Sequence, residues 1–321
     1  MRADRAFGLV LALALVSSTV LGALLAAIVP RAEHVLSAGP DDLVDAVTLL
    51  LLILATCGIA LGLGSLLRQV LATMALIRAL VARRVPTPET VRSLAREVGV
   101  EGRVDVVADE RPFSFCYWFW RPRLCISTAL AQRLEPDEMR AVLVHERYHL
   151  RHRDPLRVLT ARYLAAGLYV VPVVDELSSF YVLQKEIAAD DEAVRIVGVG
   201  ALARALYKLL PGAPDRELGL LVPVTGLSVT EARIDRLAAG RDIPLRLSPL
   251  SIALSSGALV AAAVLASIRA GSSVAFADLP PLLAVPGLLV GPVSLLFVAA
   301  LNGGAHQVRA LAGLVSRSRE S

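Results

Sequence analysis

The chain has 321 residues, of which 55% are hydrophobic and 19% are charged, and its mean hydropathy is +0.63. Soluble domains contain less apolar and more charged sequence, so this composition favours a membrane protein. The net charge of +4 does not indicate a nucleic-acid-binding protein, because nearly all basic residues are arginines beside apolar segments, with no basic patch interleaved with aromatic residues. We therefore expect no direct binding of nucleic acid.

Four uncharged segments are each long enough to cross a bilayer, which takes about 20 apolar residues. They are residues 7–29, 46–67, 247–268 and 279–301. The first follows Arg2 and Arg5 and is longer than the apolar core of a signal peptide, so we interpret it as an anchor. Arginines cluster at the N-terminus, in residues 68–246 and in residues 302–321, which predicts that these regions are cytoplasmic.

This pattern predicts a mainly α integral membrane protein. Residues 1–67 would hold two transmembrane helices, residues 68–246 a cytoplasmic domain, residues 247–301 two further helices and residues 302–321 a cytoplasmic tail. Within residues 156–183 lies an apolar stretch of only 12 residues, too short for a span. We expect a buried or interfacial helix there, bent or ended by Pro172, with a re-entrant segment as the alternative.

A short motif near the middle of the chain carries the chemistry. Residues 145–149 read His-Glu-Arg-Tyr-His, in a run without helix breakers that starts after Pro136. On a helix, His145 and His149 lie one turn apart on the same face, where two imidazoles can bind one zinc ion. Glu146 lies beside them, where a carboxylate can take a proton from water. The sequence therefore predicts a zinc site with Glu146 as general base.

A third ligand is available 37 residues after His149, in another helical run. Glu186 would complete a site of two histidines and one glutamate, which leaves a fourth position for water. Asp190 lies one turn further on the same face and could accept the free N–H of a ligating histidine. The alternative is an ordinary acidic helix face, because residues 191–192 are also acidic.

The residues before the motif favour a small sheet. Residues 103–108 are expected to form a strand, and residues 113–120 and 123–127 a hairpin that turns at residues 121–122, because they are rich in aromatic and β-branched residues. The hairpin could border the active site and accept a substrate as an extra strand. It could equally be a core hairpin, or its aromatic side chains could lie in the membrane interface.

Residues 145–154, followed by an apolar segment and by residues 186–190, resemble the M56 family of membrane zinc peptidases. This is the family of the antibiotic-sensing bacterial receptors BlaR1 and MecR1, and it is more distantly similar to the M48 peptidases Ste24 and HtpX. The likeness runs from about residue 112 to residue 237 and includes residues 126–127 and 233–237.

The resemblance implies a zincin-like α+β peptidase domain with a small sheet, facing the cytoplasm of a bacterial plasma membrane. It implies Zn²⁺ held by His145, His149 and Glu186, and a protein substrate such as a transcriptional repressor. In the receptors, an extracellular C-terminal sensor binds β-lactam. This chain ends soon after the last predicted span and has two rather than three spans before the peptidase region. We therefore expect peptidase chemistry without the β-lactam-sensing role.

Two alternatives remain open at the level of sequence. The first is an M48-like peptidase for quality control of membrane proteins, and the second is an inactive membrane scaffold. The group that stabilises the oxyanion is also left open, because spacing does not choose between the candidates Tyr148, His152, Arg153 and Arg233.

Overall fold

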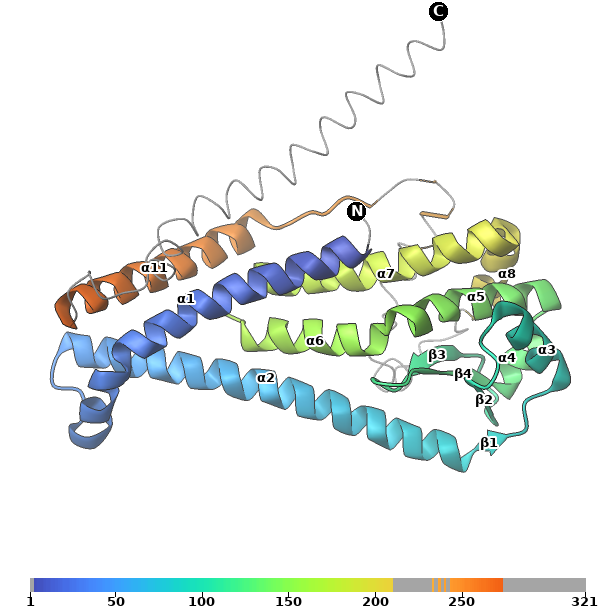
Figure 1. Ribbon diagram of the computed structural model, residues 1–321, viewed down its shortest axis with the longest axis horizontal. Coiled ribbons are helices and arrows are strands. Elements are labelled where there is room, and N and C mark those ends of the chain that lie inside the picture. Colours follow the sequence, from blue (N-terminus) through green and yellow to red (C-terminus); the bar gives the residue numbers. More distant parts are fainter. Residues whose placement is uncertain (1–2, 210–232, 234–235, 238–239, 241–242, 274–321) are drawn as a thin grey trace, which may run out of the picture. The chain divides into compact units, whose positions relative to one another are not determined.

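The computed structural model describes residues 3–209, 233, 236–237, 240 and 243–273 (Figure 1). These residues are mainly α-helical, with one small sheet. Three of the described helices are long and apolar enough to cross a membrane: α1 (Ala3–Ala38), α2 (Leu43–Ala82) and α11 (Pro249–Ser273), of which the apolar part is Pro249–Ile268. The predicted spans 7–29 and 46–67 lie inside α1 and α2, and 247–268 overlaps α11. The predicted span 279–301 and the tail lie outside the described residues.

The chain divides into two compact units. One contains Leu63–Tyr163 and the described part of Ser178–Ile243, and it holds the sheet. The other contains Leu9–Gly62, Leu164–Leu177 and the described part of α11. Between α2 and α11 the described elements are β1 (Arg84–Val85), α3 (Glu89–Val98), β2 (Val104–Val107), β3 (Ser114–Tyr117), β4 (Arg123–Ser127), α4 (Thr128–Arg133), α5 (Pro136–His152), α6 (Asp154–Gly167), α7 (Val173–Val197) and α8 (Val199–Leu209).

The sheet has four strands in the order β1-β2-β4-β3. β2 and β4 are parallel, whereas β1 and β3 run antiparallel to their neighbours. β3 is therefore an outer strand, and its pairing with β4 joins Ser114 to Ile126 and Tyr117 to Arg123. It ends before Trp118, whose φ of 72° is not compatible with an extended strand and costs an L-residue about 1–2 kcal/mol.

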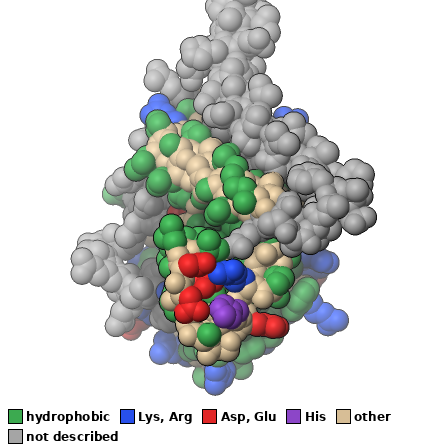
Figure 2. Space-filling view, turned by 90° about the vertical axis from the view of Figure 1, so that its left-hand side faces the viewer, with side chains coloured by type: hydrophobic (Ala, Val, Ile, Leu, Met, Phe, Trp, Pro, Cys, Tyr) green, Lys and Arg blue, Asp and Glu red, His purple; other side chains and the backbone are tan. Residues whose placement is uncertain are grey.

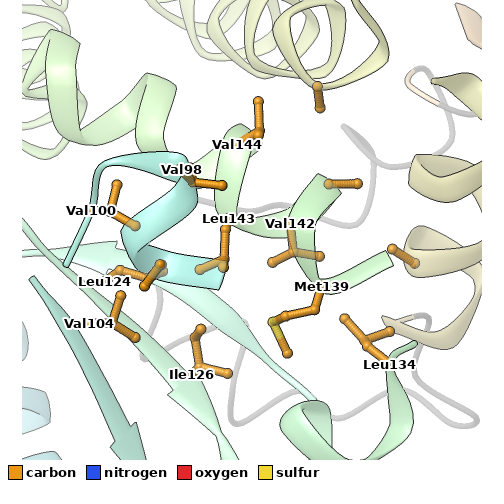
Figure 3. Close-up of a cluster of buried hydrophobic side chains, with 14 of the residues drawn as sticks. Val98, Val100, Val104, Leu124, Ile126, Leu134, Met139, Val142, Leu143 and Val144 are labelled. Carbon is orange, nitrogen blue, oxygen red and sulfur yellow. The ribbon is translucent and has the colours of Figure 1, made fainter. Parts of the chain in front are cut away.

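One face of the sheet packs against α5, which packs in turn against α3 and α8, so that all three helices share one apolar core with the sheet (Figure 3). In this core, Leu124 and Ile126 of β4 meet Met139 and Leu143 of α5, and all four side chains are at most 2% exposed. Successive strand residues face opposite sides, so Cys116 of β3 joins this core while its neighbours Phe115 and Tyr117 join a second cluster with Leu80 of α2. β3 is thus held against α5.

The second unit has its own apolar cluster, formed by α1, α2, α11 and the segment that connects α6 to α7. In this segment Leu168 and Val171 are buried among apolar residues of the long helices. Gly58 of α2 lies against Gly167, where an added Cβ would be 2.8 Å from the Gly167 carbonyl oxygen. The apolar stretch inside residues 156–183 is thus the end of one helix, a turn and the start of the next, which returns the chain in a helical hairpin. The expected Pro172 break lies in that turn.

Candidate metal centre

Helix α5 brings together the two histidines of the sequence motif. It begins at Pro136, where the Glu135 backbone N–H donates to the Glu138 carboxylate at 3.0 Å, and continues without interruption to His152. The Nε2 atoms of His145 and His149 are 3.1 Å apart, and both rings are buried. Two imidazole nitrogens that face one another at this distance are arranged to share one cation.

Helix α7 supplies the third group. Glu186 is 1% exposed, and its carboxylate oxygens lie 3.5 Å from His145 Nε2 and 3.6 Å from His149 Nε2. Zinc–nitrogen bonds of about 2.0–2.1 Å in tetrahedral geometry separate neighbouring ligand atoms by about 3.3 Å, so these separations suit zinc. Glu186 Oε2 is buried yet accepts no hydrogen bond from any described residue, which leaves it available to a metal ion.

A carboxylate lies behind each histidine. His145 Nδ1 is 2.9 Å from Asp190 Oδ1, and His149 Nδ1 is 2.6 Å from Asp154 Oδ2. The contact of His149 is a hydrogen bond that fixes an Nδ1–H donor, and at His145 the charge of Asp190 favours a proton on Nδ1, so that each Nε2 lone pair is directed at the shared site. Arg153 makes the second contact possible, because its left-handed φ of 53° ends α5 and lets α6 start at Asp154.

Two buried cations balance this negative charge. Lys185 is fully buried, and its Nζ donates to Glu186 Oε1 at 2.6 Å. Arg233 donates from Nε and from Nη2 to Asp190 at 2.8 and 2.7 Å, and its Nη1 lies 3.5 Å from Glu186 Oε2. Arg233 is therefore committed to the carboxylates that surround the metal site.

The charges shift the protonation of the site. Burial and Lys185 oppose a charged imidazole, but Glu186 and Asp154 outweigh them and raise the pKa of His149 to about 9. At Glu186, burial opposes the carboxylate, but Lys185 and the two histidines hold its pKa well below the usual range. The site without metal therefore keeps a proton where a metal ion would bind, and metal binding must release it.

Strand β3 positions the carboxylate of Glu146, the candidate base. Ser114 Oγ donates to Glu146 Oε1 at 3.0 Å, and Cys116 Sγ donates to Oε2 at 3.2 Å. Glu146 is 5% exposed, so both donors act in a nearly dry environment. Burial, followed by the charge of Glu146, raises the pKa of Cys116, which keeps its thiol protonated and able to donate.

The other sequence candidates lie differently. His152 Nδ1 is 2.8 Å from the Tyr148 carbonyl oxygen, and its ring stacks on the Tyr148 ring with centroids 4.0 Å apart. His152 thus belongs to the end of α5 rather than to the metal site. No sequence motif predicts a role for Ser114, Cys116 or Lys185. The two-residue spacing along a strand could have paired the first two, but no local signal predicts a fully buried lysine.

A second cluster of metal-binding residue types lies at the turn between α1 and α2, where His34, Asp41 and Asp45 approach one another. Figure 2, which views the left-hand side of Figure 1, shows acidic, basic and histidine side chains gathered together and bordered by hydrophobic ones. Arg31 bonds Asp45 at 2.5 Å and Asp42 at 2.9 Å, and Asp42 caps the Asp45 backbone N–H. These contacts indicate an ion-pair cluster that fixes the turn.

Comparison with known proteins identifies the family. A family model described as BlaR1 peptidase M56 matches residues 19–210, more than half of the chain. The chain therefore belongs to the M56 peptidases, a family of membrane metallopeptidases, and the predicted family membership is confirmed. No sequence among the curated proteins compared matches the chain.

Proposed function

We propose that this protein is a membrane-embedded zinc metalloendopeptidase. The protein would have four transmembrane helices and a zincin-like peptidase domain at residues 68–246. This domain would face the cytoplasm of a bacterial plasma membrane. The observation that carries it is the convergence of His145, His149 and Glu186, whose ligand atoms lie 3.1–3.6 Å apart, with Glu146 beside them. A zinc ion held by these three residues would polarise the scissile carbonyl and lower the pKa of the attacking water.

The chain's own residues would carry the proton transfers. Glu146 would accept the proton of the attacking water and later deliver it to the leaving amine. Ser114 and Cys116 hold both of its oxygens, so the carboxylate is oriented before a substrate arrives. Asp190 and Asp154 would keep the two histidines in the tautomer that presents Nε2 to the metal.

The outer position of β3 supports binding of an extended peptide. One edge of β3 pairs with β4, and no described strand pairs with its other edge. A substrate added there as a further strand would lie along the residues that hold Glu146. The substrate would be a cytoplasmic or membrane-proximal protein, and the family resemblance favours a transcriptional repressor.

This function can be tested by mass spectrometry of protein N-termini. Three cell samples are compared, which produce the native protein, Glu146→Gln or Glu101→Gln. Glu101 is an acidic surface residue paired with Arg96, so its variant is the matched control. We expect new N-termini with the native and control proteins that are absent with Glu146→Gln. One processed repressor would indicate signalling, and many membrane proteins would indicate quality control. Identical N-termini in all three samples would contradict peptidase activity.

A further inference from the structure

The chain has two tryptophans, and both lie in the loop of residues 118–122 that joins β3 to β4. Trp118 is 39% exposed and Trp120 is 74% exposed, so neither is there mainly to fill a core. Exposed tryptophans are enriched where a protein meets the membrane–water interface, because the ring is apolar and its N–H is polar. The position of the loop relative to a membrane helix therefore matters.

The loop lies beside the part of α2 that follows its uncharged segment. Trp118 and Phe119 line a largely apolar pocket with residues 69, 73 and 76 of α2. The uncharged part of α2 ends at Arg68, and a helix rises 1.5 Å per residue, so the loop meets α2 within roughly the first 12 Å beyond that end. With the hydrocarbon core ending at Arg68, the first charged residue after the uncharged segment, the headgroup layer, which is about 5–7 Å thick, would begin at this level.

Charge at the same level favours a lipid surface. Burial lowers the pKa of Arg162 in α6, and the positive charge of nearby Arg68 lowers it further. Neither arginine forms an ion pair with an acidic side chain in the described part of the chain, and the same holds for Arg121 of the loop, which is exposed. Arginines without acidic partners beside a membrane helix suit the phosphates of lipid headgroups.

We propose that the loop of residues 118–122 docks into the headgroup layer of the membrane, with Trp120 inserted among the lipids and Arg121 against their phosphates. β3 leads from this loop directly to Ser114 and Cys116 beside Glu146. Docking would therefore hold the outer edge of the sheet near the membrane surface. Its consequence for cleavage of membrane-proximal segments rests on the proposed function, whereas the docking itself does not.

Tryptophan fluorescence tests the docking, because no other tryptophan contributes to the signal. The full chain would be reconstituted in lipid nanodiscs that contain an anionic lipid and whose scaffold protein carries no tryptophan. The acyl chains would be unbrominated, brominated near the headgroup or brominated near the bilayer centre. The Trp118→Phe variant reports on Trp120 alone, and Trp120→Phe reports on Trp118. If either variant fails to fold, the native chain reports the combined emission of Trp118 and Trp120 in the same lipids.

We expect bromine near the headgroup to quench Trp120 more strongly than bromine near the bilayer centre, and acrylamide in the water to quench it weakly. Trp118, which faces the pocket, should lose less emission than Trp120. Equal emission in brominated and unbrominated nanodiscs, with free quenching by acrylamide, would overturn the proposal and leave the loop exposed to water. Equal emission in both with weak acrylamide quenching would also overturn it, because another protein surface would then cover the loop. Neither result depends on peptidase activity.

Discussion

Asp154→Asn is expected to weaken zinc binding without removing a ligand. Asp154 Oδ2 lies 2.6 Å from His149 Nδ1, and the carboxylate is almost fully buried. Loss of such a partner behind a ligating histidine typically costs 10–100-fold in metal affinity, which corresponds to about 1.4–2.8 kcal/mol. We expect the upper half of that range, because the one other described side chain that donates to Asp154 is Tyr181, at a long 3.4 Å.

The assay is competition between detergent-purified protein and a chelator of known zinc affinity. Asp191→Asn is the matched control, because Asp191 lies one residue beyond Asp190 but is half-exposed and pairs with Arg236 outside the site. Asp190→Asn would be harder to interpret, since it would also remove the nearer of the two carboxylates that pair with Arg233. Equal zinc affinity in Asp154→Asn and Asp191→Asn would refute the role given to Asp154.

Three further predictions follow from the charges and packing. Zinc affinity should rise roughly tenfold per pH unit from pH 7 to 9, because the metal-free site keeps a proton on His149 below its pKa of about 9. Calorimetry in buffers of different ionisation enthalpy measures the proton that zinc binding releases. A zinc affinity that does not change with pH would contradict this prediction. Lys185→Met should destabilise the metal-free protein by about 3–5 kcal/mol, because Glu186 loses its buried partner. Zinc should then raise the melting temperature of the variant more than that of the native protein. An equal rise in both proteins would contradict the stabilising role of the Lys185–Glu186 pair. Gly58→Ala should destabilise the protein by about 1–3 kcal/mol, because the new Cβ would lie 2.8 Å from the Gly167 carbonyl oxygen. Gly64→Ala is the control, because its Cβ would meet no atom within 4 Å. Equal melting temperatures for the two variants would show that α2 does not pack at Gly58 as described.

The candidate site could be predicted from local patterns where one helix turn was enough. The spacing of His145 and His149 fixes their common face, and the downstream Glu186 and Asp190 follow the same rule on α7. Three of the four described strands were also predictable from their composition, although β3 is shorter than expected because Trp118 leaves the extended conformation. The two-residue strand β1 was not predicted. These features can be read from local sequence, because the backbone periodicity of a helix or strand decides which side chains share a face.

Long-range contacts could not be predicted in this way. The parallel pairing of β2 with β4 places β3 at the outer edge of the sheet, and this order depends on residues far apart in the chain. Lys185 would ordinarily be expected on a solvated face, because only the fold shows that α7 buries it. The short distance from Asp154 to His149 depends on the left-handed turn at Arg153, which residue spacing does not predict.

The central claim is that His145, His149 and Glu186 hold one zinc ion. The most direct test is the zinc content of detergent-purified protein, measured for the native chain, for His149→Ala and for His152→Ala. His152 lies on the same helix but bonds the Tyr148 backbone, so it controls for general effects of histidine loss. We expect about one zinc per chain in the native protein and in His152→Ala, and none in His149→Ala. A folded native protein without zinc, or equal zinc in all three proteins, would contradict the account.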